Sequence, residues 1–177
     1  MIHEHDYGRA LFELASEQGK EADILNEISQ VEAIFEQEPT YVTLLDSHSL
    51  PKLQRLALLD DAFKSLSPYH LNFLKILCEK HAIKQYAACA KTYGDLYDKA
   101  HNILRATALT AIPMNDSQKK LLTEKLSSMT KKQVVLTNEI DSQIMGGITL
   151  RFGGVQLDDS VRSRLDDLRR SLAGVIV

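Results

Sequence analysis

The sequence has no apolar run long enough to cross a membrane and no recognisable export signal. Its apolar runs are only a few residues long, whereas a membrane-spanning helix needs roughly 20. The N-terminus, MIHEHDYGRALFELASEQ, carries acidic residues early. It lacks both a cationic start followed by an apolar stretch and the Arg-rich, acid-poor character of a transit peptide. We therefore expect neither direct membrane insertion nor export.

Cysteine is also scarce, with Cys78 and Cys89 the two examples in 177 residues. They are eleven positions apart, on what read as neighbouring helices, and do not form the Cys-x-x-Cys spacing of a redox or zinc site. We expect both to be buried as small apolar side chains rather than joined in a disulfide.

Catalytic motifs are missing as well. No two histidines have the four-residue helical spacing, with a neighbouring acid, of a zinc protease motif. The paired glycines are flanked by strand-like residues rather than by a phosphate-binding Lys-Ser/Thr, and there is no Gly-x-Ser-x-Gly elbow. Acidic pairs such as Asp60-Asp61 are adjacent in sequence, so on a helix they point apart and rarely share a proton. The sequence predicts no catalytic residue, metal site or cofactor.

Charge is distributed unevenly between the two halves. Residues 1–104 contain 10 Lys and Arg against 16 Asp and Glu, a net charge of −6, whereas residues 105–177 contain 11 against 8, a net charge of +3. Together these give the net charge of −3 of the whole chain. Such a division suggests separate partners for the two ends, although an ordinary solvated surface explains it equally well.

Apolar residues in the first half recur at helical spacing, for example Ile24, Ile28, Val31 and Phe35. Breakers such as Gly19, Pro39 and the Ser67-Pro68 pair separate the periods. We expect an all-helical bundle over residues 1–104, with six helices: Glu4–Gln18, Glu21–Gln37, Tyr41–Leu45, one that begins near Pro51, Tyr69–His81 and Lys84–Asn102.

The pattern changes after Asn102. ILRATALTAI and QVVLTNEI have the composition of strands, and Asp116–Thr130 has helical spacing. Gly153-Gly154 between GGITLRF and VQL indicates a β-hairpin, because a tight turn needs positive φ at both central positions. A last helix is expected over Ser160–Leu172, with Asp158, Asp159 or Ser160 as its N-cap. Residues 105–177 are therefore expected to form a small α/β domain, and the fold class is mostly α.

The expected last helix carries the basic residues Arg162, Arg164, Arg169 and Arg170, which leaves an alternative function open. The chain could be a small binding module that uses this helix for nucleic acid or for another helical partner. Four aspartates among these arginines cancel the field that nucleic acid binding needs, so we expect no nucleic acid partner.

Three segments together resemble the delta subunit of F-type ATP synthase, called the oligomycin-sensitivity-conferring protein in mitochondria. Val134–Gly153 (VVLTNEIDSQIMGGITLRFG) resembles the signature of the family, Leu157–Leu165 resembles its hairpin-to-helix passage, and Tyr7–Ala15 (YGRALFELA) resembles its opening helix. The resemblance spans essentially the whole chain. Local departures are His81-Ala82, where many members have Gly-Arg, and Ser163, at a common glycine position.

This resemblance implies a non-catalytic stator subunit, present once per complex at the cytoplasmic face of the bacterial cell membrane. The helical domain is expected to bind N-terminal segments of the alpha subunits of the catalytic head. The C-terminal domain is expected to bind the b subunits of the peripheral stalk, so that the head is held against the torque of the rotor.

The resemblance also implies candidate contact residues. The first and fifth helices of the family form a groove for an alpha-subunit helix, which here corresponds to Tyr7, Ala10, Leu11, Leu14, Ile76 and Lys80. Small Ala10 would permit close approach of the partner helix, and its apolar neighbours would supply burial. Several of these residues are equally explained as bundle core. The candidate stalk contacts, on the last helix, are Arg162, Leu165, Leu168 and Arg169.

Overall fold

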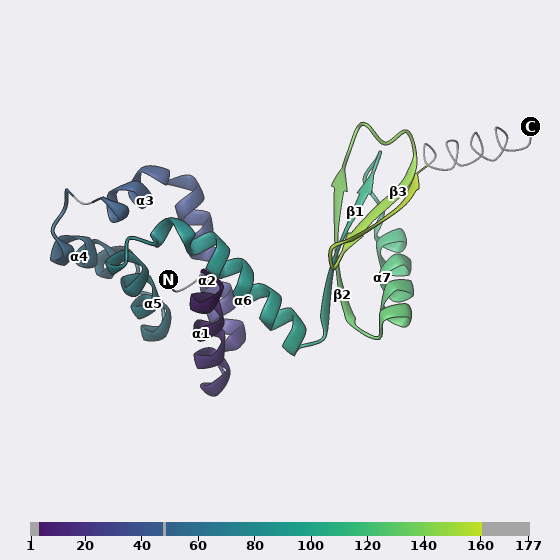
Figure 1. Ribbon diagram of the computed structural model, residues 1–177. Helices are drawn as coiled ribbons and strands as arrows, with labels where there is room; N and C mark the ends of the chain where they lie inside the picture. Colours follow the sequence, from purple (N-terminus) through teal and green to yellow (C-terminus); the bar gives the residue numbers. More distant parts are fainter. Residues whose placement is uncertain (1–3, 48, 161–177) are drawn as a thin grey trace, which may run out of the picture. The chain divides into compact units, whose positions relative to one another are not determined.

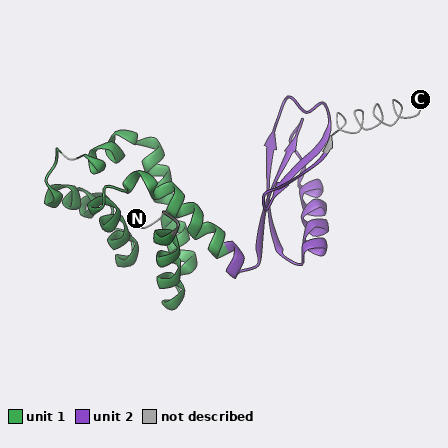
Figure 2. Ribbon diagram, viewed as in Figure 1, with its two compact units in different colours: residues 1–97 green, residues 98–177 purple. Residues whose placement is uncertain are grey.

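The computed structural model describes residues 4–47 and 49–160 and divides the chain into two compact units, coloured separately in Figure 2. Unit 1 comprises residues 1–97 and unit 2 comprises residues 98–177. The expected combination of a mostly helical chain with a small sheet is confirmed (Figure 1). The division between Tyr97 and Asp98 falls inside a helix, whereas the boundary expected after residue 104 falls inside a strand.

Unit 1 contains helices and no strand among its described residues. They are α1 (Glu4–Glu17), α2 (Glu21–Gln37), α3 (Pro39–Asp46), α4 (Lys52–Ala62), α5 (Pro68–Glu79), the short 3₁₀ helix η1 (Ile83–Gln85) and α6 (Tyr86–Ala100), which continues into unit 2.

Helix α5 begins where the Ser67-Pro68 pair predicts a helix start. Ser67 is the N-cap, and its Oγ accepts a hydrogen bond of 3.4 Å from the backbone N–H of His70. Pro68 takes the first helical position, where the missing N–H leaves no intrahelical bond unmade.

One continuous apolar core fills unit 1 and draws on every helix of the unit. The partly buried ring of Phe35 packs against this core, with ring centroids of Tyr86, Phe63 and Tyr41 at 5.2, 6.0 and 6.4 Å. Cys78 and Cys89 are both buried and both free thiols, so the prediction that they are packed without a disulfide is confirmed.

A charged side chain, Arg55 of α4, is also buried in unit 1. Its Nη1 donates to the carbonyl oxygens of Leu45 and Cys78, each at 3.1 Å, and it lies 3.0 Å from Nδ1 of His81. His81 follows α5 with a φ of 52°, the left-handed conformation that favours glycine. This chain therefore builds with histidine a turn whose backbone conformation favours glycine.

Unit 2 consists of β1 (Ile103–Thr110), α7 (Asp116–Thr130), β2 (Gln133–Ile140), β3 (Gly147–Phe152) and β4 (Val155–Ser160) over its described part, together with the end of α6. The strands form one sheet in the order β2-β1-β3-β4. Strand β1 pairs parallel with β2 and antiparallel with β3, and β3 pairs antiparallel with β4.

Helix α7 covers one face of this sheet (Figure 1). Leu126 of α7 packs with Ala106 of β1 and Val134 of β2, and this cluster is the core of unit 2. The helix begins with a capping box, in which the Asn115 side chain accepts from the Gln118 N–H and the Gln118 side chain accepts from the Asn115 N–H.

Strands β3 and β4 are joined by Gly153 and Gly154, whose φ values are 54° and 77°. Both values lie in the region that L-residues with side chains avoid.

The expected end of β4 was wrong. The sequence predicts an extended segment of Val155–Leu157 followed by a helix that begins at Ser160, but β4 continues to Ser160. Asp159 pairs with Ile148 and Ser160 with Gly147, so β3 supplies a ladder partner for each of these residues. Ser160 is therefore a strand residue rather than the first residue of a helix, but an N-cap residue also has extended backbone, so the capping role expected of Asp158, Asp159 or Ser160 stays a prediction. The rest of the helix expected over Ser160–Leu172 lies outside the described residues.

Candidate interaction site

A groove of about 340 Å³ runs between α1 and α5 in unit 1. We call it the α1–α5 groove. Its walls consist of four residues of each helix: Tyr7, Ala10, Leu11 and Leu14 from α1, and Tyr69, Asn72, Phe73 and Ile76 from α5. Five of the six residues predicted for an alpha-subunit contact are thus brought together here.

The groove residues differ in how much of each side chain remains free. Leu14 is 37% exposed and Ile76 is 47% exposed, on opposite walls. Ala10 is exposed and Tyr7 is partly buried. Leu11 is 4% exposed and belongs to the core, so it forms the floor of the groove. The groove therefore presents apolar surface to solvent on both walls.

Lys80, the sixth predicted residue, is outside the α1–α5 groove. It follows the last residue of α5 and lines a separate hollow of about 300 Å³ with Tyr7, His81, Ala82 and Gln85. Tyr7 lines both depressions and so connects them.

Sequence reasoning missed three residues of the α5 wall: Tyr69, Asn72 and Phe73. Positions 69, 72, 73 and 76 are spaced three, one and three apart, which is one face of a helix. This spacing could have indicated them once Ile76 was chosen. Tyr69 is held in place because its hydroxyl donates to Gln18 Oε1 at 3.2 Å and Lys20 lies 5.8 Å from its ring centroid.

A polar cluster, buried at His70 and Tyr86 and partly buried at Glu27 and Ser67, fixes α5 against α2 and α6. Glu27 of α2 accepts hydrogen bonds from the Ser67 N–H at 2.9 Å and the Ser67 hydroxyl at 2.8 Å. His70 is fully buried, with Nδ1 at 3.1 Å from Glu27 and Nε2 at 2.9 Å from the Tyr86 hydroxyl. Burial lowers the pKa of His70 despite the opposing Glu27 carboxylate, and burial raises the pKa of Tyr86. Both side chains are therefore neutral near pH 7.

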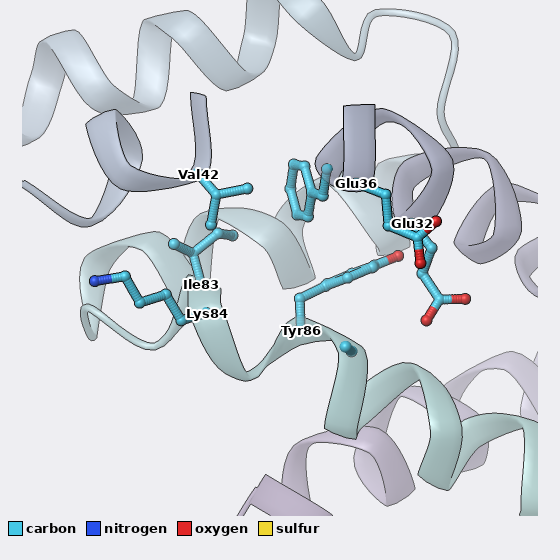
Figure 3. Close-up of a pocket in the computed structure, with 8 residues that line it drawn as sticks. Glu32, Glu36, Val42, Ile83, Lys84 and Tyr86 are labelled. Atoms are coloured by element: carbon cyan, nitrogen blue, oxygen red, sulfur yellow. The ribbon is translucent and has the colours of Figure 1, made fainter. Parts of the chain in front are cut away.

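A second hollow in unit 1, of about 200 Å³, lies among α2, α3, η1 and α6 (Figure 3). Figure 3 shows the carboxylates of Glu32 and Glu36 on one side of it and the ammonium of Lys84 on the other. Burial and, to a lesser degree, the neighbouring Glu36 raise the pKa of Glu32. Lys84 pairs instead with Asp46, at 2.9 Å.

None of these depressions holds a recognisable catalytic or metal-binding set. Over residues 4–47 and 49–160, no group of three or more His, Cys, Asp or Glu side chains is placed to hold a metal ion. No helix in the same residues has both the length and the apolar character to span a membrane. The predicted stalk contacts Arg162, Leu165, Leu168 and Arg169 lie outside the described residues.

Comparison with known proteins finds, over nearly the full length of this chain, the family that its sequence resembles. The family model described as ATP synthase delta (OSCP) subunit matches residues 4–172. The ATP synthase subunit delta of Clostridioides difficile is 31% identical over 172 residues, which cover 96% of this chain and 95% of that protein. The subunit delta of Clostridium kluyveri is 30% identical over 165 residues, 93% and 91% of the two chains.

Among solved structures, a chain of the mitochondrial ATP synthase hexamer of Toxoplasma gondii has the same fold, with a TM-score of 0.76. The match covers 98% of both chains at 21% sequence identity. From the family model and the relatives in sequence, the chain belongs to the ATP synthase delta (OSCP) subunit family, the non-catalytic stator subunits of the peripheral stalk in this membrane-associated complex.

Proposed function

We propose that the α1–α5 groove binds the N-terminal helix of an alpha subunit of the catalytic head. The observation that carries this proposal is the exposed apolar surface of Leu14 and Ile76 on opposite walls, above a floor formed by Leu11. An amphipathic helix lays its apolar face into a groove of this kind. Exposed Ala10 leaves room for a close approach of the partner backbone.

Unit 2 is proposed to bind the b subunits of the peripheral stalk, and one copy of the chain is proposed to serve each complex at the cytoplasmic face of the bacterial cell membrane. Two compact units on one chain suit a part that joins two partners. In this role the subunit performs no chemistry. It transmits force, holding the alpha subunits stationary while the rotor turns, so that rotor torque drives ATP synthesis.

Isothermal titration calorimetry tests the first half of the proposal. The full chain is titrated with a synthetic peptide of the alpha-subunit N-terminus and, as a control, with the same residues in scrambled order. We expect saturable one-to-one binding of the native peptide alone. A native peptide that gives no heat of binding at micromolar concentrations contradicts the assignment of the groove.

A matching titration with the soluble part of the b subunits tests the second half. Binding to the full chain supports the assignment of the stalk to this subunit. If the b subunits bind as well after removal of residues 98–177, unit 2 is not their site.

A further inference from the structure

An amide side chain, that of Asn72, stands among the mostly apolar residues that line the α1–α5 groove. Asn72 lies on the α5 wall and is exposed to solvent. Its side chain forms no hydrogen bond with another residue in the part of the chain that the structure describes. The amide oxygen is an acceptor and the NH₂ group donates two hydrogen bonds. In the free chain these bonds are therefore made to water.

The other polar groups of the groove are placed differently. The Tyr69 hydroxyl donates to Gln18 Oε1 at 3.2 Å, so its proton is already used. Tyr7 also lines the neighbouring hollow, and so lies where the two depressions meet rather than within the groove alone. The rest of the α1 wall has no polar side-chain atom, since it consists of Ala10, Leu11 and Leu14. Asn72 is thus the hydrogen-bonding side chain of the groove that a partner must satisfy.

Asn72 lies within the length of the α5 wall rather than at its end. Tyr69 precedes it by three positions and Ile76 follows it by four, and both line the groove. Residues three and four apart are neighbours on one face of a helix. A partner helix that covers both Tyr69 and Ile76 therefore also covers Asn72 and removes water from its amide.

The loss of this water has a cost that the partner must offset. An amide that is buried without a hydrogen-bond partner is destabilising, whereas a paired one is not. The backbone N–H and C=O groups in the middle of a partner helix bond to each other, so they leave none for Asn72. A side chain of the partner has to supply the bond.

We infer that Asn72 selects the occupant of the groove: an amphipathic helix whose apolar stripe is interrupted by one hydrogen-bonding side chain opposite Asn72. The inference rests on the proposed function, because it takes the occupant to be the N-terminal helix of an alpha subunit. It adds the chemistry by which the groove rejects a helix with an uninterrupted apolar stripe.

Calorimetry with the full chain and the alpha-subunit peptide tests this role. Asn72→Leu replaces the amide with an apolar group that branches at the same carbon. We expect about tenfold weaker binding or more, because the polar group of the peptide then loses its partner. The matched control Asn26→Leu changes an exposed asparagine of α2 outside the groove and should alter affinity less than about twofold. Equal or tighter binding of the peptide by Asn72→Leu overturns the inference.

A check on folding accompanies the binding data. Position 72 is exposed, so Asn72→Leu should unfold at nearly the same urea concentration as the unmodified chain. Asn72→Ala is a second variant, which removes the amide with a small residue that favours helix. It should also bind the peptide more weakly, and normal binding by a folded Asn72→Ala chain counts against the inference in the same way.

A series of peptides identifies the group that Asn72 binds. Each polar residue within the apolar stripe of the peptide is replaced in turn by leucine. At one position this change should weaken binding to the unmodified chain about tenfold, yet tighten binding to the Asn72→Leu chain relative to the native peptide. A merely structural role of Asn72 would not produce such an exchange of preference. Independent effects of residue 72 and of every peptide position would refute the selection.

The inference and the proposed function fail in different ways. If the native peptide does not bind the unmodified chain, the proposed function is contradicted. If the native peptide binds and the Asn72 variants bind it equally well, the assignment of the groove stands and selection by Asn72 is contradicted.

Discussion

Nδ1 of His70 on α5, which is fully buried, lies 3.1 Å from Oε2 of the partly buried Glu27 on α2. The Glu27 carboxylate has no proton to give when ionised, so Nδ1 donates and Nε2 is left to accept a hydrogen bond from the Tyr86 hydroxyl, 2.9 Å away. One carboxylate and one neutral imidazole thus connect three helices, and α5 is the helix that supplies one wall of the α1–α5 groove.

Tyr86→Phe should destabilise the chain by about 1–3 kcal/mol, because it leaves Nε2 of His70 buried without a donor. Urea denaturation followed by circular dichroism measures the change. Tyr69→Phe is the matched control, since its hydroxyl donates to Gln18 at an exposed position. It should cost less than about 1 kcal/mol, the net value of an ordinary hydrogen bond. Equal losses in the two variants would contradict this account of the buried cluster.

The buried His70 should make unit 1 sensitive to acid. Its pKa is lowered in the folded chain, so the unfolded chain takes up a proton at higher pH than the folded chain does. Stability from this residue is therefore complete above the unfolded pKa of about 6.5 and is lost as pH falls below it.

Unfolding free energies at pH 7.5 and 5.5 measure this dependence. His70→Gln should reduce the loss of stability between the two pH values, whereas His101→Gln, at an exposed position, should leave it nearly unchanged. A His70 variant with the same pH dependence as the unmodified chain would show that other groups cause it.

Gly8→Ala should destabilise unit 1 because α1 and α6 approach closely at this position. A Cβ added to Gly8 would lie 2.5 Å from the Cys89 carbonyl oxygen and 2.9 Å from Cβ of Thr92, and the first of these is backbone that cannot turn aside. We expect a loss of about 1–3 kcal/mol. Gly94→Ala on α6 meets nothing within 4 Å and should stabilise by up to about 1 kcal/mol through helix propensity. Thermal unfolding compares the two, and a tolerated Gly8→Ala would refute the close contact.

The left-handed backbone at His81 predicts an unusual ranking of substitutions. Both His81→Gly and His81→Ala lose the ring contact with Arg55, but only glycine adopts a φ of 52° without strain. The glycine variant should therefore be more stable than the alanine variant by about 1 kcal/mol. Denaturation curves measure the difference in unfolding free energy between the two variants. An alanine variant of equal or higher stability would show that the turn can leave the left-handed conformation at little cost.

Ala10→Trp should block the α1–α5 groove without unfolding unit 1, because Ala10 is exposed at the groove wall. Affinity for the alpha-subunit peptide should fall about tenfold or more, the effect expected at the centre of a small interface. Ala57→Trp is the matched control, an exposed alanine on α4 outside the groove. Calorimetry with both variants tests the site, and normal binding of the peptide by Ala10→Trp would show that the peptide binds outside the α1–α5 groove.

Local sequence patterns were sufficient to predict features of the structure that depend on neighbouring residues in the sequence. The start of α5 follows from Ser67-Pro68, and the burial of Cys78 and Cys89 follows from their helical context. The end of β4 could not be predicted from the local sequence, because it depends on pairing with residues of β3. The position of Lys80 also depends on tertiary structure: it lies past the end of α5 and lines a different hollow, and its contact with an alpha subunit, which the family resemblance implies, stays a prediction.

By itself, the sequence determined the family and the succession of a helical half and a mixed half, since apolar periodicity, turn residues and the glycine-centred run at Ile140–Gly153 are local features. Only the tertiary structure decided which apolar residues remain exposed. Leu11 and Leu14 occupy the same predicted stripe, yet one is the floor of a groove and the other its free wall. That difference arises because burial depends on the distance to a second helix or connection, and this distance is set by the packing of the whole unit.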